Sequence, residues 1–178
     1  MRTQRFSPQL QLLKPTKTAR PMSEDSLRWE PYDRHWIRLR GPWSVTWGDP
    51  TEHIAPPQRV TLPMSWGELF DGRHGTARFE RRFQQPTNLD ASERVVITLS
   101  EVRTDVSARL NDVKLSPLTH PLGDPASVPF EDVLSFDVTP YLQPTNRLTL
   151  DLTVNSLPST ETPYGLWRPV LIEVITLI

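Results

Sequence analysis

The chain of 178 residues carries 20 lysines and arginines against 21 aspartates and glutamates, a formal net charge of −1. Nucleic-acid-binding proteins and proteins of anionic membrane surfaces use a global positive field, which this balance does not supply, so we expect neither partner. Cysteine is absent, which excludes disulfides, thiolate catalysis and zinc sites built on cysteine. Hydrophobic residues at 37% and charged residues at 23% are compatible with a globular core.

The proline content indicates the fold class. There are 19 prolines against 7 glycines, a ratio that disfavours long helices and suits short strands joined by rigid corners. No window of about 12 residues has the apolar spacing of an amphipathic helix. The sequence therefore predicts an all-β protein.

The first segment of the chain differs from the rest. Residues 1–27 are polar and contain several prolines, and we expect a mobile N-terminal tail there, with residues 28–178 forming a single β-sandwich domain. The start of the chain has no apolar run of signal-peptide length, and no later run is long enough to span a bilayer. A cytoplasmic location is the corresponding expectation.

Alternation of apolar and polar residues predicts about nine strands. The clearest case begins at Arg147, where Leu148, Leu150, Leu152 and Val154 share one face of the predicted strand. Two strands, residues 93–100 and 170–178, are apolar on both faces, as central strands are. In chain order the predicted strands are residues 35–40, 43–47, 59–62, 77–83, 93–100, 105–111, 132–138, 147–155 and 170–178.

Residues 64–76 are predicted to form a long irregular connection. It holds three of the seven glycines, and such a segment either carries a site or plugs one end of a sandwich. Its candidate binding residues are an aromatic side chain, a carboxylate, a guanidinium and an imidazole, a mixture that suits the vicinal hydroxyls of a sugar. These residues are Trp66, Asp71, Arg73 and His74.

The beginning of the last predicted strand provides two further candidates. Tyr164 and Trp167 are the side chains that we expect to cover the C–H face of a sugar ring at the rim of the sandwich. The alternative is structural, with Trp167 packing the sandwich end and Arg168 capping loop carbonyls. A structural pair is also expected between Arg81 and Asp137, because Arg81 shares a face with apolar residues and its charge needs a partner.

No catalytic or metal site is predicted. Hydrolysis of a glycoside needs two carboxyl groups at a defined separation, and the nearest candidates, Glu68 with Asp71 and Glu131 with Asp132, are better explained as solvated loop charges. The four histidines are scattered without metal-ligand spacing. No phosphate-binding loop and no nucleophile elbow is present, and we expect no cofactor.

Four segments, taken in order, resemble the N-terminal sugar-binding domain of the beta-galactosidase and beta-glucuronidase family of glycoside hydrolases. The first, residues 60–66, reads Val-Thr-Leu-Pro-Met-Ser-Trp. The second, residues 75–83, is Gly75 followed by a strand that ends in Phe-Glu-Arg-Arg-Phe, similar to the Tyr-x-Arg-x-Phe strand of the family. The third, residues 102–115, is a strand that ends in Asn111. The fourth runs from Phe130 through Phe-Asp-Val-Thr at residues 136–139 and Leu142 to Asn-Arg-Leu at residues 146–148, and then to Gly-Leu-Trp-Arg-Pro-Val at residues 165–170.

The resemblance implies a galactose-binding-like jelly roll over roughly residues 40–178. Two turns depart from the family pattern: Asn111-Asp112 replaces Asn-Gly, and Gln143-Pro144-Thr145 replaces a turn glycine. In this family the catalytic carboxylates belong to a separate barrel, for which this chain has no room. The resemblance therefore implies a non-catalytic carbohydrate-binding module with an oligosaccharide or glycoside ligand. The alternative is a structural or assembly domain that docks a separate partner chain and has no sugar site of its own.

Overall fold

The computed structural model describes residues 34–48, 56–119, 132–155 and 163–176. The predicted mobile tail, residues 1–27, and the predicted start of the domain at residue 28 lie outside these ranges. In chain order the elements are β1 Arg34–Arg38, β2 Trp43–Trp47, β3 Gln58–Val60, α1 Trp66–Phe70, β4 Gly75–Gln84, β5 Glu93–Ser100, β6 Asp105–Leu110, β7 Val113–Lys114, β8 Val133–Asp137, the 3₁₀ turn η3 Thr139–Tyr141, β9 Thr145–Val154 and β10 Leu171–Thr176.

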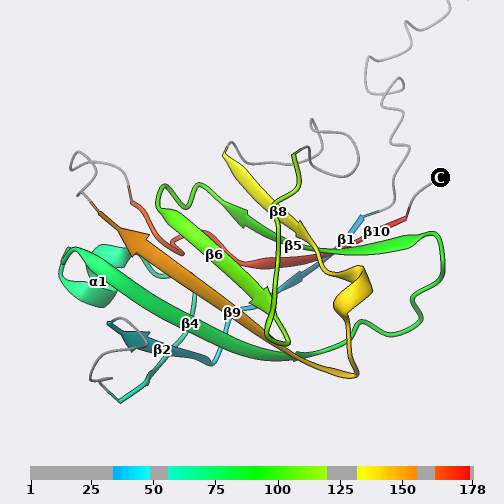
Figure 1. The fold of residues 1–178 in the computed structure, drawn as a ribbon, viewed down its shortest axis with the longest axis horizontal. Coiled ribbons are helices and arrows are strands. Elements are labelled where there is room, and N and C mark those ends of the chain that lie inside the picture. Colours follow the sequence, from blue (N-terminus) through cyan, green and yellow to red (C-terminus); the bar gives the residue numbers. More distant parts are fainter. Residues whose placement is uncertain (1–33, 49–55, 120–131, 156–162, 177–178) are drawn as a thin grey trace, which may run out of the picture.

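The strands form two antiparallel sheets that pack face to face (Figure 1). The four-stranded sheet has the order β1-β10-β5-β8, and the six-stranded sheet has the order β3-β2-β4-β9-β6-β7. The predicted all-β sandwich is confirmed. Every predicted strand has a counterpart whose described ends agree within two residues, and β7 is additional.

The core lies between the two sheets. Strand β9 pairs with β4 on one side and β6 on the other, and its alternation buries Leu148, Leu150 and Leu152 completely. Phe79 of β4, directly opposite Leu150, is also completely buried. At about 25 cal/mol per Å² of apolar surface removed from water, this inward-facing layer is the main source of stability.

The two central strands of the four-stranded sheet, β5 and β10, are buried on both faces, as their apolar composition predicts. Val96 and Ile175 lie on the face that points away from the core, and both are almost fully buried. Glu173 lies on the same face and is 3% exposed, and its carboxylate accepts a hydrogen bond of 2.8 Å from Arg34 of β1. Pairing with a guanidinium lowers the cost of burying this carboxylate.

The connection predicted to be irregular, residues 64–76, contains the helix α1, and this is a correction. Ser65 caps the helix: its hydroxyl accepts from the backbone N–H of Glu68 at 3.3 Å, and the Glu68 carboxylate accepts from the backbone N–H of Ser65 at 2.8 Å. This reciprocal capping box satisfies backbone donors that a helix of five residues otherwise leaves open. Asp71 ends the helix in the left-handed region at φ 51°.

The capping box makes the stability of the protein depend on pH. Hydrogen bonds from the Ser65 hydroxyl and then from its backbone N–H lower the pKa of Glu68 from its ordinary value of 4.5. A lowered folded-state pKa stabilises the protein above the unfolded value, and that stabilisation is lost as pH falls through the folded-state pKa. We expect the difference in unfolding free energy between wild type and Glu68→Gln to be constant from about pH 6 to 8 and to shrink below about pH 4.5, measured by urea unfolding. A difference that grows on acidification contradicts this assignment.

The expected pair of Arg81 with Asp137 is wrong. Arg81 lies in the six-stranded sheet and donates to the carbonyl of Pro42 at 2.7 Å. Asp137 lies in the other sheet, where its carboxylate accepts from the backbone N–H of Thr139 at 2.9 Å and from its hydroxyl at 2.6 Å. A backbone carbonyl, rather than a carboxylate, therefore accepts the hydrogen bond of the Arg81 guanidinium.

None of the helices in the described ranges has the length and apolar character that crossing a membrane requires.

Candidate functional site

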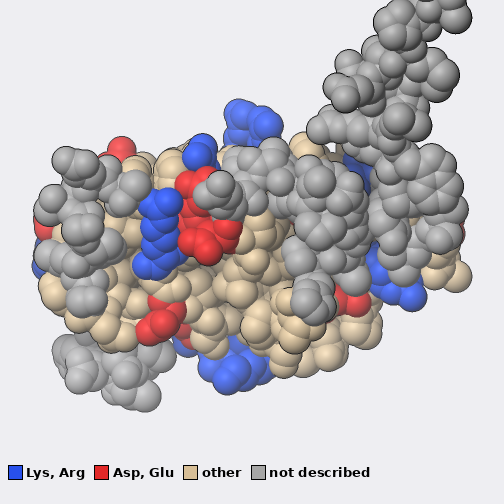
Figure 2. Space-filling view, turned by 90° about the horizontal axis from the view of Figure 1, so that it is seen from above, with Lys and Arg blue, Asp and Glu red and all other residues tan. Residues whose placement is uncertain are grey.

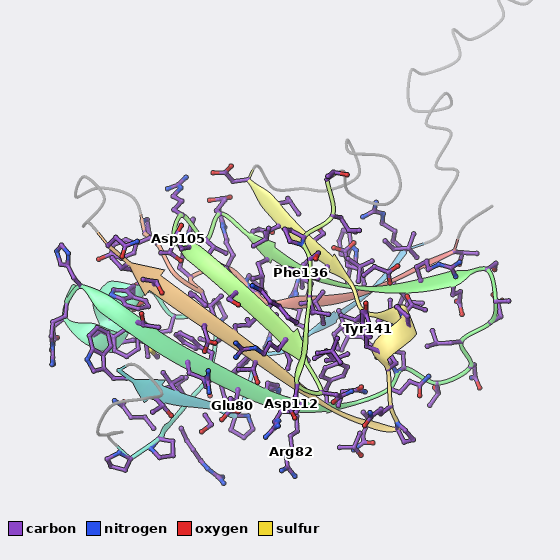
Figure 3. All side chains as sticks on the ribbon, in the orientation of Figure 1. Glu80, Arg82, Asp105, Asp112, Phe136 and Tyr141 are labelled. Carbon is purple, nitrogen blue, oxygen red and sulfur yellow. The ribbon has the colours of Figure 1, made fainter. Side chains whose placement is uncertain are left out.

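A polar hollow of about 420 Å³ opens at the end of the sandwich where β4 and β6 begin and β9 ends. We call it the end hollow. Figure 3 marks its position through Asp105, the first residue of β6. It is lined by Arg103, Thr104, Asp105, Thr153, Val154 and Asn155.

Strand register and a strained connection together position these side chains. Asp105 of β6 is directly opposite Thr153 of β9, so the start of β6 and the end of β9 lie side by side at one end of the sheet. The residues between β5 and β6 place Glu101 at φ 52° and Arg103 at φ 54°. Residues with a Cβ adopt such angles rarely and at a cost, and they cluster at functional sites.

Hydrogen bonds order the rim of the end hollow. The side-chain amide of Asn155 donates to the Asp105 carboxylate at 2.9 Å, and the backbone carbonyl oxygen of Asn155 lies 3.1 Å from Nδ1 of His74. The Thr153 hydroxyl lies 3.0 Å from that of Thr76. The Thr104 hydroxyl is buried and has no hydrogen-bond partner among the described residues. A carboxylate, an amide, hydroxyls and a guanidinium thus surround one small volume.

Trp66, predicted as a ligand platform, is a core residue in this structure, and this is a correction. Its side chain is completely buried, and its indole N–H donates to the carbonyl of Arg73 at 2.7 Å. The ring packs against Trp47 at a centroid distance of 5.6 Å and against Phe70 at 4.6 Å. No face of the Trp66 ring is available to a sugar here, because protein atoms cover it.

Asp71, Arg73 and His74 are exposed near the same end. Asp71 and Arg73 form an ion pair of 3.7 Å in which both side chains remain largely in solvent, so it contributes little to stability. The Arg73 guanidinium also lies 6.0 Å above the ring of Trp47. Of these predicted residues, His74 is the one that contacts a residue lining the end hollow, Asn155.

Tyr164 and Trp167 are both partly buried. The backbone carbonyl of Tyr164 accepts from the N–H of Trp66 at 2.9 Å, which ties this segment to α1. The Trp167 indole donates to the carbonyl of Glu101 at 2.9 Å, and the Arg168 guanidinium lies 4.1 Å above the Trp167 ring. Arg168 is also paired with the Glu101 carboxylate at 3.2 Å. One face of Trp167 is therefore occupied, and its indole caps a loop carbonyl.

Sequence reasoning missed most residues of the end hollow. Asp105 and Asn155 are 50 positions apart along the chain, and the pairing of β6 with β9 brings them together. The signal that could have identified them was the polar face of β9, which continues through Asp151 and Thr153 to Asn155. Within the described ranges, no three histidine, aspartate or glutamate side chains gather in a way that could hold a metal ion.

No protein-family model matches the sequence, and no curated protein matches it. Solved structures do match the fold. An FMN-binding beta-glucuronidase from Faecalibacterium prausnitzii matches 79% of this chain with a TM-score of 0.58 and 20% identity. A putative beta-galactosidase from Bacteroides fragilis matches 79% with a TM-score of 0.58 and 15% identity, and a beta-glucuronidase from Bacteroides uniformis matches 80% with a TM-score of 0.59 and 16% identity.

The matched region is a small part of each of these proteins. It covers 22% of the Faecalibacterium chain, 23% of the B. fragilis chain and 18% of the B. uniformis chain. Identities at this level establish the fold alone. The chain is therefore a β-sandwich with the jelly-roll fold of one domain of beta-glucuronidases and beta-galactosidases, consistent with the N-terminal sugar-binding domain that its motifs resemble.

Proposed function

We propose that this chain is a non-catalytic carbohydrate-binding module whose site is the end hollow together with His74. The observation that supports this most strongly is the set of donors and acceptors around one volume of about 420 Å³, ordered by the bond from Asn155 to Asp105. A sugar presents neighbouring hydroxyls that both donate and accept, and such a mixed set can pair with them.

The similarity in fold to enzymes of known type indicates which ligands to test first. The similar structures are beta-glucuronidases and a putative beta-galactosidase, so glucuronides and galactosides head the panel. A shallow polar site exchanges water for ligand with little net gain, so we expect dissociation constants of about 1 mM or weaker.

The carboxylates support binding without catalysis. The lining of the end hollow includes one carboxylate, Asp105, whereas glycoside hydrolysis uses a pair. Glu68 is held in the α1 capping box, which lowers its pKa, and a general acid at neutral pH needs a raised pKa. Asp71 is exposed and paired with Arg73.

A second candidate, an assembly domain that docks a separate chain, has one observation in its favour. The edge strand β1 exposes two neighbouring large apolar side chains, Trp36 at 44% and Ile37 at 36%. Strand alternation places them on opposite faces, however, and apolar interfaces bury contiguous patches. The end hollow therefore has the stronger support.

Ligand-observed NMR with Asp105→Ala tests the proposal. Saturation-transfer signals from a bound glucuronide or galactoside should appear with wild type and decrease at least about fivefold with the variant, because the carboxylate and its bond to Asn155 are lost. Asp90→Ala is the matched control, since Asp90 lies in the turn before β5 and hydrogen bonds within that turn. Equal signals from Asp105→Ala and Asp90→Ala, or no signal from wild type with any sugar of the panel, would contradict the proposal and favour the assembly domain.

A further inference from the structure

A second hollow, of about 440 Å³, lies on the six-stranded sheet away from the core, and arginines dominate its lining. We call it the arginine hollow. It spans parts of β2, β3, β4 and β9, and Figure 3 labels two of the side chains around it, Glu80 and Arg82. Its lining residues are Pro42, Trp43, Ser44, Arg59, Glu80, Arg81, Arg82 and Arg147.

The charge pattern here departs from the rest of the same sheet face. Beside this hollow, Arg78 of β4 is opposite Asp151 of β9, and the two form a bidentate ion pair at 2.7 and 3.0 Å. In the arginine hollow, Arg82 of β4 is directly opposite Arg147 of β9. Like charges in directly opposite positions destabilise a sheet. Arg82 therefore faces a like charge across the strand pair, whereas Arg78 faces an opposite one.

The arginines that line this hollow differ in whether a carboxylate is paired with them. Arg147 is paired with Asp112 at 2.7 Å, and that carboxylate is 78% exposed. Neither Arg59 nor Arg82 has an ion-pair partner among the described residues, and Glu80 is the one carboxylate of the lining. On the face seen in Figure 2, in contrast, basic and acidic side chains form small neighbouring groups with uncharged surface between them.

Arg81 forms part of the wall of the hollow. Its guanidinium donates to the Pro42 carbonyl at 2.7 Å, and its Nε is buried without a partner within the described ranges. This bond anchors one positive charge in place, whereas the side chains of Arg59 and Arg82 are exposed to solvent. Guanidinium groups bind oxyanions through planar, two-oxygen contacts, and several of them gather around this hollow.

We propose that the arginine hollow binds an oxyanion, the carboxylate, sulfate or phosphate group of a ligand, between Arg82, Arg147 and Arg59. The anion offsets the like charges of Arg82 and Arg147 and takes hydrogen bonds from the guanidiniums of Arg59 and Arg82, which have no ion-pair partner among the described residues. This site is separate from the end hollow and does not depend on carbohydrate binding there.

The test is an NMR titration of the folded chain at constant ionic strength, followed on the arginine side-chain Nε–Hε signals and the amides of β4 and β9. The probes are sodium sulfate, sodium phosphate and sodium glucuronate, with glucose as the uncharged comparison. We expect saturable shifts with at least one anion, and binding about 10-fold weaker in Arg82→Ala, which corresponds to losing one charge-assisted contact.

Arg94→Ala is the matched control, because it removes one positive charge from the other sheet, where Arg94 donates to the carbonyls of Ala91 and Glu93. It should bind the anions as wild type does. Preference for glucuronate over the inorganic ions would identify an acidic sugar as the source of the oxyanion, and the reverse order would identify a free ion. Linear shifts without saturation, equal binding by Arg82→Ala and wild type, or equal shifts with glucose would overturn the proposal.

Discussion

Replacing Trp66 with alanine should lower the free energy of unfolding by about 3–5 kcal/mol, the cost typical of removing a large aromatic side chain from a core. Trp66 is completely buried, and its ring contacts those of Trp47 and Phe70. The substitution also removes the indole donor of the Arg73 carbonyl, so α1 and the following turn lose their anchor. Urea unfolding followed by circular dichroism measures the change.

Trp36→Ala is the matched control for this prediction. The substitution is the same, but Trp36 is 44% exposed on the edge strand β1, so much less area leaves water on folding. We expect a loss of about 1 kcal/mol or less. Similar losses in the two variants would contradict the assignment of Trp66 to the core and would return it to the set of candidate ligand platforms.

Replacing Asn146 with alanine should cost about 2–3 kcal/mol, because its side chain connects two turns. The residue is 1% exposed. Its carbonyl oxygen accepts from the backbone N–H of Gln143 at 2.9 Å and from the Asn111 amide at 3.0 Å, and its amide donates to the Gln143 carbonyl at 2.6 Å. A partly buried group left without its partner costs about 1–3 kcal/mol, and alanine removes several partners together.

Gln143→Ala separates this effect from a general sensitivity of the turn. The side chain of Gln143 is exposed, and Asn146 binds its backbone groups, which alanine retains. The control should change the unfolding free energy by less than about 0.5 kcal/mol. A loss in Gln143→Ala as large as in Asn146→Ala would show that the turn itself, rather than the Asn146 side chain, provides the stability.

The strands could be predicted from the sequence because alternation is a local signal. Strand β5 was predicted with the bounds that the structure has, and β9 begins two residues earlier than predicted. Strand β7 was missed since its two residues are too short to show a period of two. Helix α1 was missed because five residues make little more than one turn, although Ser65 followed three positions later by Glu68 was a readable capping signal.

The candidate site was harder to predict because it depends on register between distant strands. The side chains of the end hollow come from the start of β6 and the end of β9, and no local pattern joins them. The burial of Trp66 depends on how α1 folds back onto Trp47, which composition alone does not show. The expected pair of Arg81 with Asp137 failed for a related reason, because a backbone carbonyl, as well as a carboxylate, can accept a hydrogen bond from a guanidinium.

The most direct test of the account is a two-dimensional amide NMR titration of the whole chain with glucuronides, galactosides and other common oligosaccharides. We expect saturable shifts concentrated in His74, residues 103–105 and residues 153–155, which surround the end hollow. Shifts scattered evenly over the sandwich, or none with any sugar at concentrations well above about 1 mM, would contradict carbohydrate binding at this site.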